Sequence, residues 1–230
     1  LNEAAILAAR NGAKKIVQRD LVEASTKVKL GPERRLLQTD EERKMIAYHE
    51  AGHALVSQKV PDMDPVGRVS IVARGASLGH TSITPLRDRY NETKTRLVSM
   101  ITTMLGGRAA EEIIFNELTI GAADDIEKAT KLARKMVTQY GMSKLGPISF
   151  NSRGGEHMLA RDFGLHAPAY SNEMAAKIDE EVEIIVDSAY KEAKKILNEN
   201  KGILDIIAGA LLEKETLYED EFKELISQEE

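Results

Sequence analysis

The sequence predicts a mainly α-helical protein with one small β-hairpin or sheet. Apolar residues recur at intervals of three and four over long stretches, most clearly in 97–105, 129–137 and 174–189. This spacing is typical of α-helices that bury one face. Alternation of the kind that strands require is confined to 66–84. With 42% apolar and 30% charged residues among 230, the chain has enough apolar side chains for a buried core.

The N-terminal region, 1–33, is expected to form two short helices. Asp20, with Glu23 three residues later, predicts a capping box that opens the second helix, and Thr216 with Glu219 predicts one for the last helix of the chain. We interpret 1–33 as the end of a domain that lies upstream, 34–38 as a linker and 39–230 as a second domain. The alternative is that the two helices pack on the domain that follows. Because the chain begins inside a predicted helix, we expect it to be a fragment of a longer protein.

Composition argues against several classes of partner and site. The net charge of −5, the absence of tryptophan and the low aromatic content argue against a nucleic-acid partner. Because the sequence has no cysteine, disulfides and cysteine-ligated metals are excluded, and any metal site must use histidine and carboxylate. No run of about 18 apolar residues occurs that could span a membrane, so we expect this chain to be soluble.

A helix that begins after Thr39 is expected to carry the chemistry. Thr39 and Glu42 match a capping box, in which each side chain accepts a hydrogen bond from the backbone N–H of the other residue. Pro61 and Pro65 cannot continue a helix, so the helix should end near 58–60.

Within this helix, 47–55 contains the pattern His-Glu-x-x-His. His49 and His53 are four residues apart and project from the same face, where two imidazoles can hold one zinc ion. Glu50 is the expected general base on a zinc-activated water, whose pKa zinc lowers to about 7. The alternative, a histidine pair in an apolar core, would bury polar groups without compensation. The pattern therefore predicts a zinc hydrolase.

Residue spacing leaves the third zinc ligand open. A hydrolytic zinc uses three protein ligands and keeps one position for water. The extension that would add a third histidine fails, because Val56 and Lys59 stand where glycine and histidine are needed. The remaining histidines lie in a predicted strand or in loops and are expected at the surface; they are His80, His157 and His166.

Two pairs of acids are better candidates for the third ligand. Glu111 and Glu112 follow a pair of glycines on a predicted helix. Asp124 and Asp125 stand at the start of another helix, after a short loop. Spacing does not choose between the two pairs.

Four segments resemble the motifs of one family and occur in the same order. They are Ala-Tyr-His-Glu-Ala-Gly-His-Ala-Leu (47–55), Leu-Gly-Gly-Arg-Ala-Ala-Glu-Glu (105–112), Gly-Ala-Ala-Asp-Asp-Ile-Glu-Lys-Ala-Thr (121–130) and Lys-Ile-Asp-Glu-Glu-Val (177–182). The family is that of the FtsH-type ATP-dependent zinc metalloproteases, which join an AAA ATPase to a mostly helical peptidase domain. The resemblance covers 38–230 as the peptidase domain, and it implies that 1–33 is the end of the ATPase lid.

The resemblance also implies a ligand set. In this family the third zinc ligand is an aspartate that aligns with Asp125, so His49, His53 and Asp125 would hold the metal. The usual Asn-Asp-Ile of the family reads Asp-Asp-Ile here, which places a second carboxylate at Asp124. Glu111 would then be structural or would orient a ligand.

The resemblance further implies a homo-hexameric ring, anchored by membrane segments upstream of this chain. Such a protease would work at the cytoplasmic face of the bacterial inner membrane, where it degrades unfolded, short-lived and membrane proteins processively. ATP and Mg²⁺ would bind only in the upstream ATPase domain, since the pattern Gly-x-x-x-x-Gly-Lys-Ser/Thr does not occur here. His80 stands where tyrosine is common and is given no catalytic role. The strand around 79–84 is expected to be an edge to which an extended substrate adds.

Two other functions compete with this interpretation. One is a helical assembly domain that has lost catalysis, and the intact set His49, Glu50, His53 and Asp125 argues against it. The other is a zinc hydrolase that acts on a small molecule, which an open edge strand suits less well than it suits a polypeptide.

Overall fold

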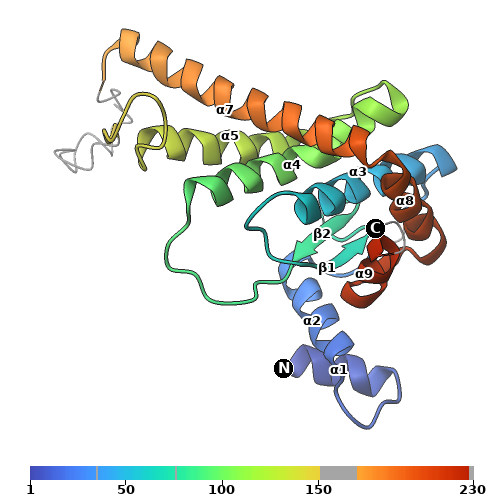
Figure 1. Cartoon of the computed structure of the whole chain (residues 1–230). Coiled ribbons are helices and arrows are strands. Elements are labelled where there is room, and N and C mark those ends of the chain that lie inside the picture. Colours follow the sequence, from blue (N-terminus) through green and yellow to red (C-terminus); the bar gives the residue numbers. More distant parts are fainter. Residues whose placement is uncertain (35, 76, 151–169, 228–230) are drawn as a thin grey trace.

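The computed structural model describes residues 1–34, 36–75, 77–150 and 170–227 (Figure 1). Its helices are α1 (Asn2–Arg10), α2 (Gln18–Leu30), α3 (Asp40–Lys59), α4 (Lys94–Phe115), the 3₁₀ helix η1 (Ile120–Ala122), α5 (Ala123–Thr138), α7 (Asn172–Glu199), α8 (Lys201–Lys214) and α9 (Glu219–Ser227). Its strands are β1 (Val66–Ser70), β2 (His80–Ile83) and β3 (Thr216–Tyr218). This arrangement confirms the mainly α-helical class with a small sheet. The expectations for His157 and His166 lie outside the described residues.

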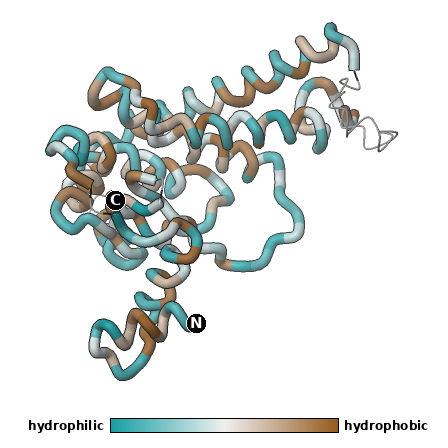
Figure 2. Tube along the Cα trace, turned by 180° about the vertical axis from the view of Figure 1, so that it is seen from behind, coloured by the Kyte–Doolittle hydropathy of each residue, from teal (hydrophilic) through white to brown (hydrophobic). Residues whose placement is uncertain are grey.

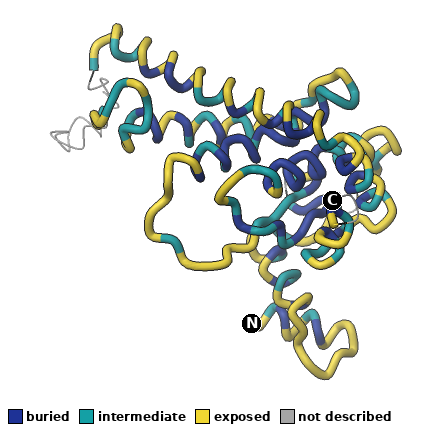
Figure 3. Tube along the Cα trace, in the orientation of Figure 1, coloured by how far each residue is buried: buried dark blue, intermediate teal, exposed yellow. Residues whose placement is uncertain are grey.

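Helix α3 is the central element of the fold, and its middle turns are buried (Figure 3). Its start is capped as predicted. The Glu42 N–H donates to Thr39 Oγ1 at 3.2 Å, and the Thr39 N–H donates to the Glu42 carboxylate at 2.8 Å. The helix ends at Lys59, two residues before Pro61, which confirms the predicted end.

The helices pack around two buried apolar clusters. One cluster gathers side chains of α3, α8, α9 and the sheet, together with the C-terminal parts of α4 and α7, and the other gathers side chains of α4, α5 and α7. Figure 2 shows apolar positions recurring along these helices, as the three- and four-residue spacing predicts. Among the described residues, no helix combines the length and the apolar composition needed to cross a membrane.

Helices α3 and α4 touch through their backbones. A Cβ atom on Gly52 would lie 2.5 Å from the carbonyl oxygen of Gly106, and one on Gly106 would lie 2.8 Å from the carbonyl oxygen of Gly52. Only glycine therefore permits this approach. Although the pair Gly106-Gly107 could have ended or bent the helix, α4 continues through it without a break. Packing against α3 offsets the low helix propensity of glycine.

The sheet is antiparallel in the order β2-β1-β3, so β2 lies at one edge. Val69 of β1 pairs with Thr81 of β2 and with Leu217 of β3. The hairpin and the edge position of its second strand were predicted; the third strand was not.

Strand β3 takes the place of a predicted N-cap. Thr216 and Glu219 match a capping box for α9, but this prediction is wrong. Thr216 instead pairs with Ser70, with their hydroxyl oxygens 2.7 Å apart. The N–H of Tyr218 donates to the carboxylate of Glu221 at 3.1 Å. Pairing with β1 satisfies the backbone of this segment, so a contact distant in sequence overrides the local signal.

Helix α2 docks on the sheet through ion pairs. Glu23 lies 2.6 Å from Arg68 of β1 and also contacts Arg74, and both arginines are buried. The predicted capping box of Asp20 with Glu23 is wrong. Asp20 is inside the helix, and its carboxylate accepts from the N–H of Val17 at 2.9 Å. Glu23 is one turn farther into the helix, where it neutralises the two buried arginines.

Candidate metal centre

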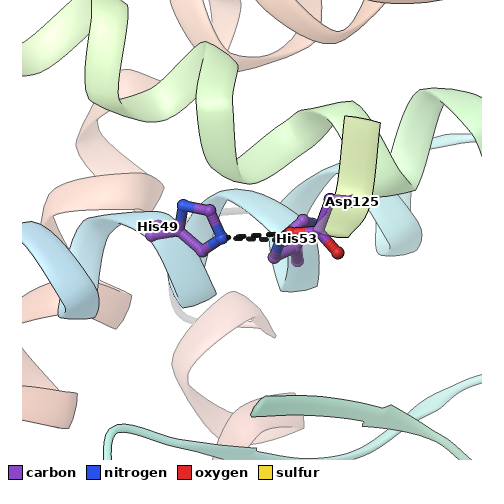
Figure 4. Close-up of side chains that lie close together, drawn as sticks. All are labelled: His49, His53 and Asp125. Carbon is purple, nitrogen blue, oxygen red and sulfur yellow. Dashed lines mark hydrogen bonds and ion pairs between the residues drawn. The ribbon is translucent and has the colours of Figure 1, made fainter. Parts of the chain in front are cut away.

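Three side chains from two helices converge on one point (Figure 4). His49 and His53 project from α3, and Asp125 projects from the first turn of α5. The Nε2 atoms of the two histidines are 3.0 Å apart. Oδ2 of Asp125 lies 3.3 Å from Nε2 of His49 and 3.2 Å from Nε2 of His53. The structure thus brings together the three residues that the resemblance implies as ligands.

The partners behind the two rings decide which nitrogen faces this point. Nδ1 of His49 lies 2.6 Å from Oε1 of Glu111, and Nδ1 of His53 lies 2.7 Å from the backbone carbonyl oxygen of Thr103. Both partners are acceptors, so each Nδ1 carries the hydrogen, and Nε2 of a neutral ring presents a lone pair. Two lone pairs and a carboxylate oxygen then face one another. Such an arrangement is favourable only with a cation among them.

The spacing of the donor atoms fits a zinc ion. Tetrahedral zinc, with bonds of about 2.0–2.2 Å to nitrogen and oxygen, places neighbouring donors about 3.3–3.5 Å apart. The three separations observed here are 3.0, 3.2 and 3.3 Å, within about 0.3 Å of the lower end of that range. A Cβ atom at Gly107 of α4 would lie 2.6 Å from ring atoms of both His49 and His53. Glycine at this position therefore keeps the space around the donors open.

The electrostatics of the cluster also favour positive charge. Burial opposes protonation of His49, but hydrogen bonds to Asp125 and Glu111 outweigh it and raise the pKa of His49 to about 10. Burial would raise the pKa of Asp125, whereas its contacts with the two histidines hold that pKa well below the usual range. Burial would also raise the pKa of Glu111, but hydrogen bonds from His49 and Thr119 outweigh it and lower that pKa. Donors of this kind bind a metal ion in competition with the proton.

The acids that spacing left open occupy different places. Asp125 is the one that lies in the cluster. Asp124 is exposed and forms an ion pair with Lys128 at 2.5 Å. Glu112 contacts two side chains of α7, on the other side of α4. Glu111 lies behind His49, on the ring nitrogen that faces away from Asp125.

Glu111 joins His49 to the segment that carries Asp125. Its Oε1 contacts His49, and its Oε2 accepts from both the N–H and the hydroxyl of Thr119, each at 3.1 Å. Thr119 in turn caps η1, since its Oγ1 accepts from the N–H of Gly121 at 3.1 Å. Helix α5 follows η1 directly. One carboxylate thus orients a ring of α3 and fixes the loop that leads to Asp125.

Glu50 is buried on α3, next to His49 and beneath strand β2. Oγ1 of Thr81 lies 2.8 Å from Oε2 of Glu50. A Cβ atom on Gly79 would lie 2.7 Å from Oε1 of Glu50. Burial raises the pKa of Glu50, although the two histidines and Thr81 act in the opposite direction. A raised pKa makes a carboxylate a stronger proton acceptor, which suits a general base.

Comparison with known proteins now decides the family. The model of peptidase family M41 matches residues 36–225. The chain belongs to peptidase family M41. This confirms the relationship to FtsH-type proteases that the four motifs predicted, and it makes the chain a metallopeptidase domain.

Relatives of this M41 domain are similar over nearly its whole length. The chain is 48% identical over 228 residues to the ATP-dependent zinc metalloprotease FtsH of Caldicellulosiruptor bescii, covering 98% of this chain and 37% of that protein. It is 47% identical over 232 residues to the ATP-dependent zinc metalloprotease FtsH of Thermotoga maritima, covering 100% of this chain and 38% of that protein. The chain therefore spans little more than a third of the length of these relatives.

Sequence reasoning missed several groups around the M41 site. They are the side chain of Thr81, the backbone of Gly79 and Gly107, and the carbonyl group of Thr103. Two adjacent glycines within a helical apolar stripe are a signal for Gly107, because a glycine in a helix interior often permits close contact. The other three groups depend on which segments meet in space, and no local pattern predicts them.

His80 of the M41 domain differs from the expectation of a surface histidine. Both of its ring nitrogens are buried, and they have no hydrogen-bond partner within the described residues. Burial, together with the positive charges of Arg68 and Arg74, lowers the pKa of His80 to about 4, against the opposing effect of Glu23. His80 pairs with Ser70, so its side chain lies on the same face of the sheet as those of Ser70 and Arg68. This is the face that contacts Glu23 of α2.

Proposed function

We propose that this M41 domain is a zinc endopeptidase in which His49, His53 and Asp125 hold the metal and Glu50 is the general base. The observation that carries the proposal is the convergence of two imidazole lone pairs and one carboxylate oxygen, 3.0–3.3 Å apart. The zinc named in the relatives supports the identity of the metal. Three protein ligands leave one coordination position for chemistry.

In this proposal the protein residues have separate tasks. Bound zinc would supply a Lewis acid that polarises the scissile carbonyl and lowers the pKa of water. Glu111 and the carbonyl group of Thr103 fix the tautomers and ring orientations of the two histidines. Glu50 accepts the proton of the attacking water and delivers it to the leaving amine.

The edge strand β2 is proposed to bind the substrate. It pairs with β1 on one side, and the described residues include no strand on the other. An extended polypeptide can add there through main-chain hydrogen bonds, beside the helix that carries the histidines. Main-chain recognition tolerates many side chains, which suits a protease that degrades diverse unfolded proteins.

The name ATP-dependent, given to the relatives, supports a larger proposal for the parent protein. Residues 1–33 would be the end of the ATPase lid, 34–38 the linker and 39–230 the peptidase domain. The parent would be a homo-hexamer that is anchored by upstream segments at the cytoplasmic face of the bacterial inner membrane. It would degrade unfolded, short-lived and membrane proteins processively, with ATP and Mg²⁺ bound upstream of this chain.

Metal content and casein cleavage, measured together, test the core of this proposal. The wild-type chain is expected to bind one zinc ion per chain and to cleave unfolded casein, and Glu50→Gln is expected to keep zinc and lose cleavage. Glu112→Gln is the matched control, because that carboxylate contacts α7 and should leave both properties unchanged. Equal cleavage by wild type and Glu50→Gln would refute the base, and a zinc-free, inactive wild type would favour an assembly domain.

A further inference from the structure

Strand β2 holds a hydroxyl group against the carboxylate of Glu50. Thr81 pairs with Val69, and cross-strand partners point to the same face of a sheet. Val69 is fully buried in the cluster that includes α3, so Thr81 also faces α3. Its Oγ1 lies 2.8 Å from Oε2 of Glu50 and 3.2 Å from the backbone carbonyl oxygen of Glu50. A hydroxyl group has one proton, and an ionised carboxylate is a stronger acceptor than a backbone carbonyl group. Thr81 therefore donates its hydrogen bond to the Glu50 carboxylate.

The same strand confines the other oxygen of this carboxylate. Gly79 directly precedes β2, and a Cβ atom on it would point toward Glu50, as the side chain of Thr81 does. A Cβ atom there would lie 2.7 Å from Oε1 of Glu50, 2.9 Å from its Cγ and 2.9 Å from the carbonyl oxygen of Ser70. The strand backbone thus lies directly against Oε1, while the threonine hydroxyl binds Oε2. These contacts restrict the torsions of a side chain that would otherwise have several rotamers.

We propose that Thr81 is a positioning residue for peptide cleavage, which holds the Glu50 carboxylate in the orientation from which it transfers protons. The inference rests on the proposed function, in which Glu50 is the general base. A base must be held within a few tenths of an ångström of its productive geometry by neighbours that are themselves fixed. Thr81 is fixed in this way, because its backbone is paired with β1.

Removal of the hydroxyl group should slow the reaction step more than it weakens substrate binding. Thr81→Val keeps the shape and the β propensity of the side chain but removes the donor. We expect kcat for an internally quenched casein-derived peptide to fall about 10- to 100-fold, the effect of losing one hydrogen bond to a charged group. KM should change less than about twofold. Thr81→Ser, which restores the donor, should recover kcat to within about threefold of wild type.

Three controls separate this inference from its alternatives. Thr138→Val is the matched substitution, because the hydroxyl group of Thr138 donates to the carbonyl oxygen of Arg134 at the end of α5. The kcat of this variant should equal that of wild type. Zinc content and the melting temperature of Thr81→Val should match wild type, which excludes a loss of fold or metal. Glu50→Gln, assayed in parallel, tests the base itself.

Each outcome has a defined meaning. A wild-type kcat in Thr81→Val, beside an inactive Glu50→Gln, would overturn the positioning role and leave the proposed function intact. An equal loss of kcat in Thr81→Ser and Thr81→Val would also overturn the role of the hydroxyl group. Wild-type cleavage by Glu50→Gln would overturn the proposed function, and the inference with it.

Discussion

Nδ1 of His49 lies 2.6 Å from Oε1 of Glu111, a carboxylate that also accepts two hydrogen bonds from Thr119. This contact turns Nε2 of His49 toward Asp125, and it ties α3, α4 and the loop before α5 into one unit. The candidate metal site therefore depends on three segments that are distant in sequence. The sequence left Glu111 among the possible zinc ligands, whereas in the structure its carboxylate contacts Nδ1 of His49, on the side of the ring that faces away from Asp125.

Glu111→Gln should weaken zinc binding without abolishing it. The amide still fills the space but no longer matches both Nδ1 of His49 and the two donors of Thr119 with a charged acceptor. Loss of such an outer contact typically lowers metal affinity about 10- to 100-fold. Competition with a fluorescent chelator measures the affinity. Glu112→Gln, one residue away, should bind zinc as wild type does; equal weakening in both variants would show that Glu111 has no special role.

Gly107→Ala should remove the metal but not the fold. The new methyl group would lie 2.6 Å from ring atoms of both histidines and would push them apart. Alanine is the better helix former, by about 1 kcal/mol, so helix α4 itself should tolerate the change. Gly209→Ala in α8 is the control, because a Cβ atom there meets nothing within 4 Å. We expect zinc to be absent by elemental analysis in the first variant and present in the second. Full zinc content in Gly107→Ala would contradict the close contact between residue 107 and the two histidine rings.

His80 should make the protein less stable in mild acid. Its pKa is about 4 in the fold, lowered by burial and by Arg68 and Arg74 against the pull of Glu23, while an unfolded histidine titrates near 6.5. Between these values the unfolded chain binds more protons. The free energy of unfolding should therefore fall as the pH falls from about 6.5 to 4, by up to about 1.4 kcal/mol per pH unit.

The control for this pH dependence is His80→Phe, which cannot titrate. Urea unfolding of both metal-free proteins between pH 4 and 7 should show a shallower pH dependence of the unfolding free energy in the variant. The dependence should not vanish, because the other titrating groups remain. Parallel curves for the two proteins would show that His80 is protonated equally in the folded and unfolded chains.

Ile83→Pro should impair cleavage if the substrate adds to β2. Proline removes a backbone donor from the edge strand and disfavours further strand pairing. We expect kcat/KM for unfolded casein to fall about tenfold or more, with zinc content unchanged and the far-ultraviolet circular dichroism preserved. Arg87→Pro, in the exposed segment after β2, is the matched control and should cleave as wild type does. Undiminished cleavage by a folded Ile83→Pro protein would eliminate strand addition as the binding mode.

Local signals predicted the elements of this fold better than the contacts between them. The capping box of Thr39 and Glu42 and the two prolines after α3 act within a few residues, and the structure agrees with them. The boxes expected at Asp20 and Thr216 failed for different reasons. Helix α2 begins at Gln18, so Asp20 is already inside it and accepts from the N–H of Val17, while Glu23 pairs with two buried arginines. Thr216 pairs with strand β1 instead of capping α9.

The same distinction holds for the candidate site. The spacing of His49 and His53 on one helix follows from helical geometry alone. Asp125 is 72 residues farther along, and only the packing of α4 against α3, through Gly52 and Gly106, brings the start of α5 to the two rings. Thr81 reaches Glu50 through strand pairing. No periodicity in the sequence encodes these distances, although the family motifs implied the aspartate.

Anomalous diffraction at the zinc absorption edge, from crystals of the wild-type chain grown with zinc, tests the central claim most directly. We predict one peak per chain, within bonding distance of Nε2 of His49, Nε2 of His53 and a carboxylate oxygen of Asp125, with Asp124 and Glu111 outside the coordination shell. A peak bound by Glu111 or Asp124 in place of Asp125, or no peak at this site, would contradict the account.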